Sequence, residues 1–414
     1  MDDSRGTKAV HISSRLMTAS YGAQFVDEED IDAVCAVLRG TNLTCGTLVD
    51  QFEEKLANIV KARYAITCSN GTTALHLASI VAGIKPGDYV IVPSITFLAT
   101  ANAPRTCGAN ILFCDVDPNS GLIEESHVID AIKRSPQKPV ALYPVDLAGQ
   151  PACTAAIRKL CQEYDIKIIE DACHALGTTF VADNLKSAVG DNAYADLTIF
   201  SFHPVKNITT GEGGAVTTND SILYEKMKCL RSHGMIRGSR HFNNVDLAFD
   251  DAHTINPWYY EMQEIGYNYR LTDIQAALGI SQLNKLENFK GIRRSLKSAY
   301  DQILEPYKEC IAPIRAVQNA DPCWHLYTVL IDFEKLGVSR AFIMKALSER
   351  KIGSQVHYIP VHLQPYYSQH GFASELPGAM SYYAKTLSLP LHVHLNTEDI
   401  KYITRNLLEV LGLQ

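Results

Sequence analysis

Residues 201–215 read SFHPVKNITTGEGGA and place one lysine, Lys206, between an apolar stretch and a glycine-rich turn. A phosphate-binding P-loop needs its glycines before the lysine and a Ser or Thr after it, whereas here the glycines follow. The ordinary alternative is a solvated loop lysine. Because Lys206 directly follows an apolar, strand-like run, where open α/β sheets build their sites, we predict a desolvated amine with a lowered pKa that acts as a nucleophile.

Short apolar runs alternate with amphipathic segments over the first two-thirds of the chain. Such runs, rich in β-branched residues, are typical of strands buried in a mostly parallel sheet. The segment 151–164 is one of the amphipathic stretches between them. The alternation predicts α/β layering. The runs occupy residues 64–68, 89–93, 111–116, 140–145, 166–170, 197–202 and 213–218.

The pattern changes after about residue 270. Residues 271–304 read as long helix with little interruption, and Thr272 with Gln275 has the spacing of a capping box. An apolar run and two further helical segments follow, at 324–332, 339–350 and 397–412.

We therefore predict two domains, a large one over residues 1–270 and a linking helix with a small α+β domain over residues 271–414. The N-terminal segment of the large domain is a candidate to pack on the small domain. Residues 236–262 show no clear period and read as an irregular, functional excursion, because long structureless loops are otherwise uncommon. Whether residues 236–256 form a lid is left open.

Composition excludes several classes of protein. The chain has 414 residues and a formal net charge of -7, so it has no basic surplus for a nucleic-acid backbone. No apolar run approaches the roughly 20 residues of a membrane helix. The polar N-terminus lacks the features of a signal peptide, and we expect a cytoplasmic protein without a membrane partner. The 11 cysteines are scattered without Cys-x-x-Cys spacing, which predicts reduced thiols and no metal site.

Two other strand ends carry residues suited to binding a phosphorylated ring. Residues 70–73, Asn-Gly-Thr-Thr, open an apolar helix after a strand, and backbone N–H groups with hydroxyls at such a point bind phosphate. A plain N-cap is the alternative. Phe97, at the end of another strand, is a candidate to stack on a flat cofactor, although such residues usually belong to the core.

Asp171 and His174 follow a buried strand in IIEDACHALG, residues 168–177. A carboxylate there caps a helix or pairs with the pyridinium nitrogen of pyridoxal 5′-phosphate (PLP). A lone histidine is more often structural than catalytic. A phosphate cradle, an acid, an aromatic platform and a lysine at the strand ends of one sheet together favour PLP.

The motifs resemble those of a known enzyme family. SFHPVKNITTGEGGA, IEDACHALG, GYNYRLTDIQAALGISQL and PVDLAGQPA are similar to sequences of the DegT/DnrJ/EryC1/StrS sugar aminotransferases, from about residue 21 to the C-terminus. The resemblance implies PLP-dependent transferase fold type I, aspartate aminotransferase-like, with a large domain on a mixed, mostly parallel seven-stranded sheet. Within the family, residues 256–279 and 354–367 most resemble members of pseudaminic acid biosynthesis, which aminate C4 of a UDP-linked 4-keto-6-deoxy-N-acetylhexosamine.

The resemblance also implies roles for single residues. Lys206 matches the lysine that binds PLP covalently, and Asp171 matches the partner of the ring nitrogen. His174 stands where the family contacts the ring hydroxyl, and Phe97 matches the stacking position. The residues matching phosphate contacts are Gly71, Thr72, Thr73 and Ser201, joined by Asn268, which matches a residue that reaches the cofactor of the other subunit.

That last match implies a homodimer with shared active sites. L-glutamate is the implied amino donor, and pyridoxamine phosphate is the implied intermediate. The nucleotide-sugar is implied to meet Tyr21, Thr41, Thr44, His357 and Tyr358.

Two details qualify the resemblance. Relatives usually read Thr-Gln-Gly where this chain has Thr-Cys-Gly at 44–46, so Cys45 replaces a polar residue near the sugar site. Some relatives replace the lysine by histidine and run dehydration chemistry, but this chain keeps Lys206. The alternatives are a sibling aminotransferase of the legionaminic or perosamine type and a PLP-binding homologue without turnover.

Overall fold

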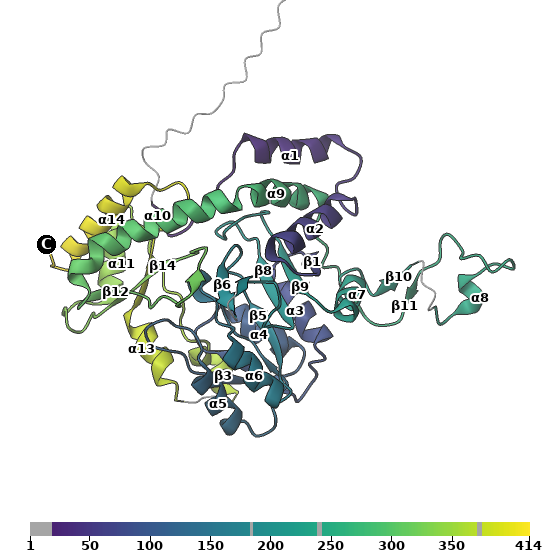
Figure 1. Cartoon of the computed structure of the whole chain (residues 1–414), viewed down its shortest axis with the longest axis horizontal. Helices are drawn as coiled ribbons and strands as arrows, with labels where there is room; N and C mark the ends of the chain where they lie inside the picture. The colour runs from purple at the N-terminus through teal and green to yellow at the C-terminus, as the bar shows by residue number, and fades with distance from the viewer. Residues whose placement is uncertain (1–18, 183–184, 238–241, 371–374) are drawn as a thin grey trace, which may run out of the picture.

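The chain, seen here as a computed structural model, is described over residues 19–182, 185–237, 242–370 and 375–414. Figure 1 shows a large part built around a sheet, a smaller part formed by the C-terminal segments, and an arm that projects away from both. Among the described residues, no helix is long and apolar enough to cross a membrane.

The large part is organised by a seven-stranded sheet in the order β1-β9-β8-β5-β4-β2-β3. Strand β9 runs antiparallel to both of its neighbours, and the other neighbouring pairs are parallel. The seven apolar runs of the sequence supply these strands, so the predicted α/β fold is confirmed. The strands are β1 (Tyr64–Cys68), β2 (Tyr89–Pro93), β3 (Asn110–Cys114), β4 (Ala141–Leu142), β5 (Lys167–Asp171), β8 (Leu197–Ser201) and β9 (Gly214–Thr218).

Helices cover this sheet and bury its strands, which explains why the runs are mostly apolar rather than alternating. Helix α3 packs against β8 and β9, and α4 packs against β2 and β3. The helices of the large part are α1 (Glu28–Arg39), α2 (Leu48–Val60), α3 (Gly71–Val81), α4 (Leu98–Thr106), α5 (Glu125–Arg134), α6 (Ala155–Glu163) and α7 (Ser221–Leu230).

A long helical segment connects the two parts. It consists of α9 (Asp273–Asn284) and α10 (Leu286–Leu304), which meet at Lys285. The capping box expected at its start is present, because Thr272 and Gln275 each bond the other's backbone N–H. The Lys285 ammonium pairs with Asp27 at the N-cap of α1, which fixes α1 against this helix.

The small part is an antiparallel sheet with helices packed on it. Strand β14 lies between β12 and β15, and α14 packs against α10 and α11. The backbone N–H of Ala19 donates to Lys351 at 2.9 Å, so the first described residues lie on this part. Its elements are β12 (Ile311–Pro313), β14 (Tyr327–Ile331), α11 (Arg340–Glu349), α12 (Pro365–Gln369), α13 (Pro377–Lys385), β15 (Thr386–Leu389) and α14 (Thr397–Val410).

The described residues of the irregular segment, 236–237 and 242–262, lie in the arm. Strands β10 (Met235–Ile236) and β11 (Glu261–Met262) pair at its base, and α8 (Val245–Ala248) lies farther out. A second small sheet escaped the sequence analysis because its strands are short and partly exposed. It contains β6 (Thr179–Ala182), β7 (Leu185–Ala188) and β13 (Ala320–Asp321).

Candidate active site

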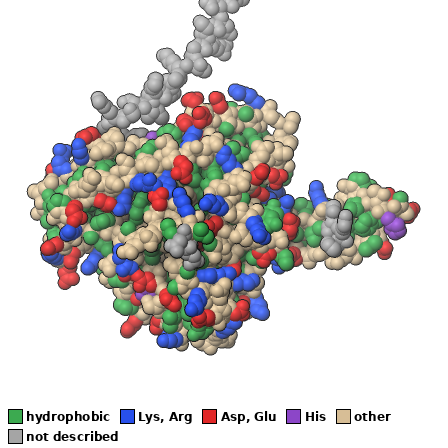
Figure 2. All heavy atoms as spheres, in the orientation of Figure 1, with side chains coloured by type: hydrophobic (Ala, Val, Ile, Leu, Met, Phe, Trp, Pro, Cys, Tyr) green, Lys and Arg blue, Asp and Glu red, His purple; other side chains and the backbone are tan. Residues whose placement is uncertain are grey.

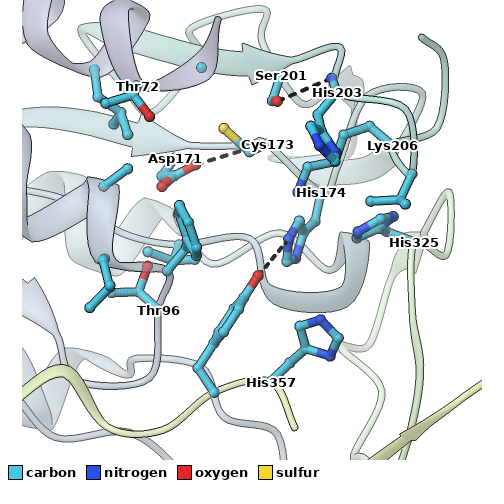
Figure 3. Close-up of a pocket in the computed structure, with 18 of the residues that line it drawn as sticks. Thr72, Thr96, Asp171, Cys173, His174, Ser201, His203, Lys206, His325 and His357 are labelled. Carbon is cyan, nitrogen blue, oxygen red and sulfur yellow. Dashed lines mark hydrogen bonds between the residues drawn. The ribbon is translucent and has the colours of Figure 1, made fainter. Parts of the chain in front are cut away.

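A cavity of about 590 Å³ opens at the carboxyl ends of β1, β2, β5 and β8. Parallel strands end at the same edge of the sheet, so the loops after them bring distant residues together. Figure 3 shows these side chains directed into one space. The predicted residues that line the cavity are Tyr21, Gly71, Thr72, Phe97, Asp171, His174, Ser201, Lys206, His357 and Tyr358.

One wall is the N-terminus of α3, which suits a phosphate group. Asn70 Oδ1 accepts the backbone N–H of Thr73 at 2.9 Å, and Thr73 Oγ1 accepts that of Asn70 at 3.1 Å. Asn70 therefore caps α3, as the alternative prediction stated, and the hydroxyl of Thr73 is part of this cap. A Cβ added to Gly71 would lie 3.0 Å from Ser201 Cβ, so glycine lets the helix approach β8 closely. Gly71, Thr72 and Ser201 thus line a small cradle at a helix N-terminus.

Asp171 ends β5 and turns its carboxylate into the cavity (Figure 3). Thr100 Oγ1 donates to Oδ2 at 2.6 Å, and the backbone N–H of Cys173 donates to Oδ1 at 3.2 Å. No helix begins after Asp171, so the helix-cap alternative does not apply. The two donors fix the orientation of the carboxylate, and a carboxylate held in this way suits the partner of a protonated ring nitrogen.

Lys206 follows β8 and is partly buried on the cavity wall. Desolvation lowers the pKa of its amine, while the nearby Cys173 and Asp171 act in the opposite direction. A lowered pKa leaves more of the amine unprotonated and able to attack a carbonyl carbon. The geometry therefore fits the nucleophile predicted from the sequence better than a solvated loop lysine.

Histidines also line this cavity, and His174 and His325 lie beside Lys206 (Figure 3). The imidazole of His174 lies 4.4 Å from that of His325 between ring centroids, tilted by 45°, and its Nε2 lies 3.1 Å from the hydroxyl of Tyr358. Burial lowers the pKa of both rings well below the ordinary value. His357 bonds Ser388 Oγ through Nδ1 at 2.9 Å, and burial lowers its pKa to about 3. All three imidazoles are therefore neutral at neutral pH.

Phe97 forms an apolar side of the same cavity. Its side chain is 56% exposed, and its ring centroid lies 6.2 Å from that of Tyr358. A core position would be buried. An exposed ring on a cavity wall is instead available to a flat ligand.

Besides Thr73, three predicted residues are absent from the cavity lining of their own chain. Thr41, Thr44 and Asn268 are exposed, and they are absent from the cavity lining. Cys45 is also exposed and has a left-handed backbone with φ of 60°. The expectation that Asn268 serves another subunit agrees with this placement, and no contact in one chain tests it.

The lining residues that the sequence did not indicate include Thr96, Cys173, His203 and His325. Cys173 and His203 lie within motifs that were singled out, so their proximity to Asp171 and Lys206 was a usable signal. His325 comes from the small part, and its sequence surroundings carry no signal of this role. Among the described residues, no cluster of three or more acidic, histidine or cysteine side chains could hold a metal ion.

The sequence pattern of the DegT/DnrJ/EryC1/StrS aminotransferase family matches residues 24–408. The chain belongs to this family. It is 35% identical over 392 residues to the UDP-4-amino-4,6-dideoxy-N-acetyl-beta-L-altrosamine transaminase of Campylobacter jejuni, covering 95% of this chain and 97% of that one. It is thus a PLP-dependent sugar aminotransferase.

Solved structures agree with this assignment. Helicobacter pylori PseC, an aminotransferase of pseudaminic acid biosynthesis, aligns with a TM-score of 0.84 at 31% identity, covering 95% of this chain and 99% of that one. Spr1654 of Streptococcus pneumoniae, solved in a PLP form, aligns with a TM-score of 0.82 at 26% identity, covering 95% and 98%. The predicted fold type and cofactor are therefore confirmed for this enzyme.

The residues present fit PLP. The cradle that a Cβ at Gly71 would fill suits the phosphate, and the oriented carboxylate of Asp171 suits the ring nitrogen. Lys206 has an amine of lowered pKa for the aldehyde carbon, and Phe97 offers a ring face.

Proposed function

We propose that this aminotransferase moves an amino group from L-glutamate to C4 of a UDP-linked 4-keto-6-deoxy-N-acetylhexosamine, as in pseudaminic acid biosynthesis. The observation that carries the chemistry is the placement of Lys206 and Asp171 on the walls of one cavity, each with the electrostatic surroundings that its role needs. When bound, PLP withdraws electrons from the carbon that carries the migrating amino group.

Lys206 has two tasks in this proposal. Its amine would hold the cofactor, and the same amine, when unprotonated and free, would serve as the general base and acid that moves a proton at the Cα of the amino donor. Asp171 keeps the ring nitrogen protonated through its carboxylate. Gly71, Thr72 and Ser201 bind the phosphate, with Thr73 capping the helix that forms the cradle.

The substrate assignment is supported by the Campylobacter jejuni and Helicobacter pylori relatives. Tyr21, His357 and Tyr358 line the cavity and are the proposed sugar contacts within one chain. The alternatives are keto-sugars of the legionaminic or perosamine type, which require the same chemistry. Discrimination between such sugars depends on the pocket contacts to the hydroxyl groups by which they differ.

A panel of purified nucleotide-linked 4-keto-sugars tests this assignment. Each is incubated with the enzyme and L-glutamate, and the amino-sugar product is resolved by chromatography and mass spectrometry. We expect the highest kcat/KM for the UDP-linked L-series 4-keto-6-deoxy-N-acetylhexosamine. A higher value for a GDP-linked or D-series sugar would instead assign the sibling function, and no turnover of any sugar would favour the non-catalytic homologue.

We further propose a cytoplasmic homodimer in which Asn268 of one subunit reaches the cofactor phosphate of the other. Thr41 and Thr44 would also meet the substrate of the other subunit, since both lie exposed and away from the cavity of their own chain. The projecting arm and its exposed apolar side chains support an interface on this side of the molecule (Figure 2).

A further inference from the structure

The residue that follows Lys206 in the chain is buried and is absent from the cavity lining. This residue is Asn207, and its Nδ2 donates to the backbone carbonyls of Leu176 at 3.0 Å, Cys323 at 3.1 Å and His174 at 3.3 Å. The opposite orientation of the amide would aim its oxygen at three carbonyl oxygens, so these contacts themselves determine which atom is the nitrogen. One buried amide therefore gathers three carbonyls beside the lysine.

The three carbonyls come from two different parts of the molecule. Two of them lie in the loop that follows Asp171, and the third, that of Cys323, lies in the segment that brings His325 to the cavity. All three residues are buried, and among the described residues no other hydrogen bond reaches these carbonyls. A buried carbonyl without a donor is costly, so the Asn207 amide is what satisfies them. It joins the lysine loop to the loop of Asp171 and to the small part.

The backbone that the amide binds is tightly packed from behind. Gly149 has φ of 99°, and a Cβ added to it would lie 2.5 Å from the carbonyl oxygen of Cys323, so only glycine fits there. Thr178 Oγ1 donates to the carbonyl of Gly149 at 2.8 Å and accepts the backbone N–H of Cys323 at 2.9 Å. The acceptors of the Asn207 amide are therefore held in place by contacts of their own.

The lysine lies in a short loop that is closed at its base. The backbone N–H of Thr210 donates to the carbonyl of Phe202 at 3.0 Å, and within the loop that of Lys206 donates to the carbonyl of His203 at 2.9 Å. Asn207 lies between these two bonds and is the next residue after the lysine. Its amide therefore helps to set the point from which the lysine side chain enters the cavity.

We propose that Asn207 is a positioning residue that holds the Lys206 amine at the place relative to Asp171 where the cofactor aldehyde is bound. This inference rests on the proposed roles of Lys206 and Asp171. Asn207 acts through the main chain and touches neither cofactor nor substrate. A nucleophile reacts well only within a narrow range of distance and direction, so its backbone must be fixed. Because Cys323 is one of the acceptors, the small part contributes to this fixing.

Two steps of cofactor uptake separate this role from a contact to the cofactor. PLP first binds in the cradle, and the Lys206 nitrogen then bonds the aldehyde carbon while the aldehyde oxygen and two hydrogens of the amine leave as water. Asn207 is not part of the cradle. Loss of its amide should therefore slow the bond-forming step and leave the preceding binding step unchanged.

The test follows PLP uptake by the cofactor-free enzyme with stopped-flow absorbance over a range of PLP concentrations. In Asn207→Ala we expect the limiting rate at saturating PLP to fall about tenfold to a hundredfold, because misplacing a reacting group by about 1 Å costs up to this much. The half-saturating PLP concentration should stay the same. Asn207→Ser restores one donor and should recover part of the rate. Borohydride reduction and mass spectrometry then give the fraction of chains with PLP linked to Lys206, which should follow the same order.

Asn192 provides a matched control in another part of the large domain. Its Nδ2 donates to Thr198 Oγ1 at 3.3 Å and to the carbonyl of Thr217 at 3.2 Å, and it is absent from the cavity lining. Like Asn207, it has a buried Oδ1 without a hydrogen-bond partner among the described residues. Asn192→Ala should lower the free energy of unfolding and capture PLP at the wild-type limiting rate.

A limiting rate in Asn207→Ala equal to that of the wild type overturns the proposal. So does a rise in the half-saturating PLP concentration alone, since Asn207 would then serve the cradle, or an equal slowing in Asn192→Ala, since the effect would then be a general loss of stability. If circular dichroism shows that Asn207→Ala does not fold, Asn207→Ser takes its place, and a wild-type limiting rate in that variant overturns the proposal. A wild type that never links PLP to Lys206 is a different outcome, which overturns the proposed function itself.

Discussion

The Asp171 carboxylate is held by a chain of two threonine hydroxyls. Thr100 donates its hydrogen to Asp171 Oδ2 at 2.6 Å, so the hydroxyl of Thr96, 2.8 Å from that of Thr100, must be the donor in their pair. Both threonines are buried. Residues 96–100 therefore both place Phe97 at the cavity and orient the carboxylate of Asp171.

Removing the Thr100 hydroxyl should weaken catalysis. Hydrogen bonds to charged groups contribute roughly 1.5–3 kcal/mol, so Thr100→Val should lower kcat about tenfold or more. Thr100→Ser keeps the hydroxyl and should recover most of the loss. Steady-state kinetics and the PLP dissociation constant measure the effect. Equal kcat values in Thr100→Val and the wild type would show that the chain does not direct Asp171.

The lowered pKa of the Lys206 amine predicts how the rate of PLP capture depends on pH. Desolvation lowers its pKa below the ordinary 10.5, and Asp171 acts against this. The rate at which cofactor-free enzyme captures PLP should rise with pH and reach its plateau below that value, since only the unprotonated amine reacts. Asp171→Asn removes a charge that favours the ammonium form, so its plateau should begin at still lower pH. Stopped-flow absorbance measures both profiles, and a midpoint near 10.5 would contradict the account.

At the scale of elements, a buried ion pair ties α2 to the end of α7. Glu53 on α2 accepts the backbone N–H and the hydroxyl of Thr67, both at 2.8 Å, and pairs with Arg231. The Arg231 guanidinium also donates to the carbonyl of Thr67 at 2.8 Å. These contacts hold β1, which leads directly into the phosphate cradle.

Breaking this pair should destabilise the fold. Glu53→Ala leaves Arg231 buried without its partner, and such changes cost about 3–5 kcal/mol. Urea unfolding followed by circular dichroism measures the free energy of unfolding. The exposed pair of Lys401 and Glu398 provides the control, because Glu398→Ala at a solvent-exposed pair should change it by less than about 1 kcal/mol. Equal effects of the two substitutions would refute the structural role of Glu53.

The strands show which parts of the fold can be predicted from the sequence and which cannot. The seven sheet strands were predictable because they are largely buried on both faces and are therefore mostly apolar. Strands β6 and β7 were not, because Leu185 and Val181 are exposed and the strands show no continuous apolar run. Lys206 and Asp171 were predictable from motifs at strand ends, whereas the bond from Thr100 to Asp171 spans 71 residues and depends on sheet register.

At the scale of the whole molecule, the arm is the feature that a single chain does not explain. Trp258 is 75% exposed and Ile265 is 77% exposed, and Tyr260 and Met262 are also exposed near its base. Figure 2 shows apolar side chains on the arm, which stands clear of the body. Large exposed apolar side chains gathered on one projection favour an interface.

The proposed homodimer should depend on this arm. Light scattering after gel filtration should give twice the chain mass of 45.7 kDa for the wild type. The double variant Trp258→Ser, Ile265→Ser should shift toward the monomer and bind PLP more weakly, because Asn268 of the other subunit is lost from the cradle. Tyr402→Ser on α14 serves as a control at a separate exposed residue. A monomeric wild type with full activity would contradict the shared-site proposal.

The central claim is that Lys206 carries PLP and that L-glutamate is the donor. Absorption spectra of the PLP-loaded wild type and Lys206→Ala, recorded before and after adding L-glutamate, test it most directly. The account predicts that the visible band of the wild type disappears and a band near that of pyridoxamine phosphate grows, while Lys206→Ala binds cofactor and shows no such conversion. A Lys206→Ala enzyme that converts its cofactor as the wild type does would contradict it.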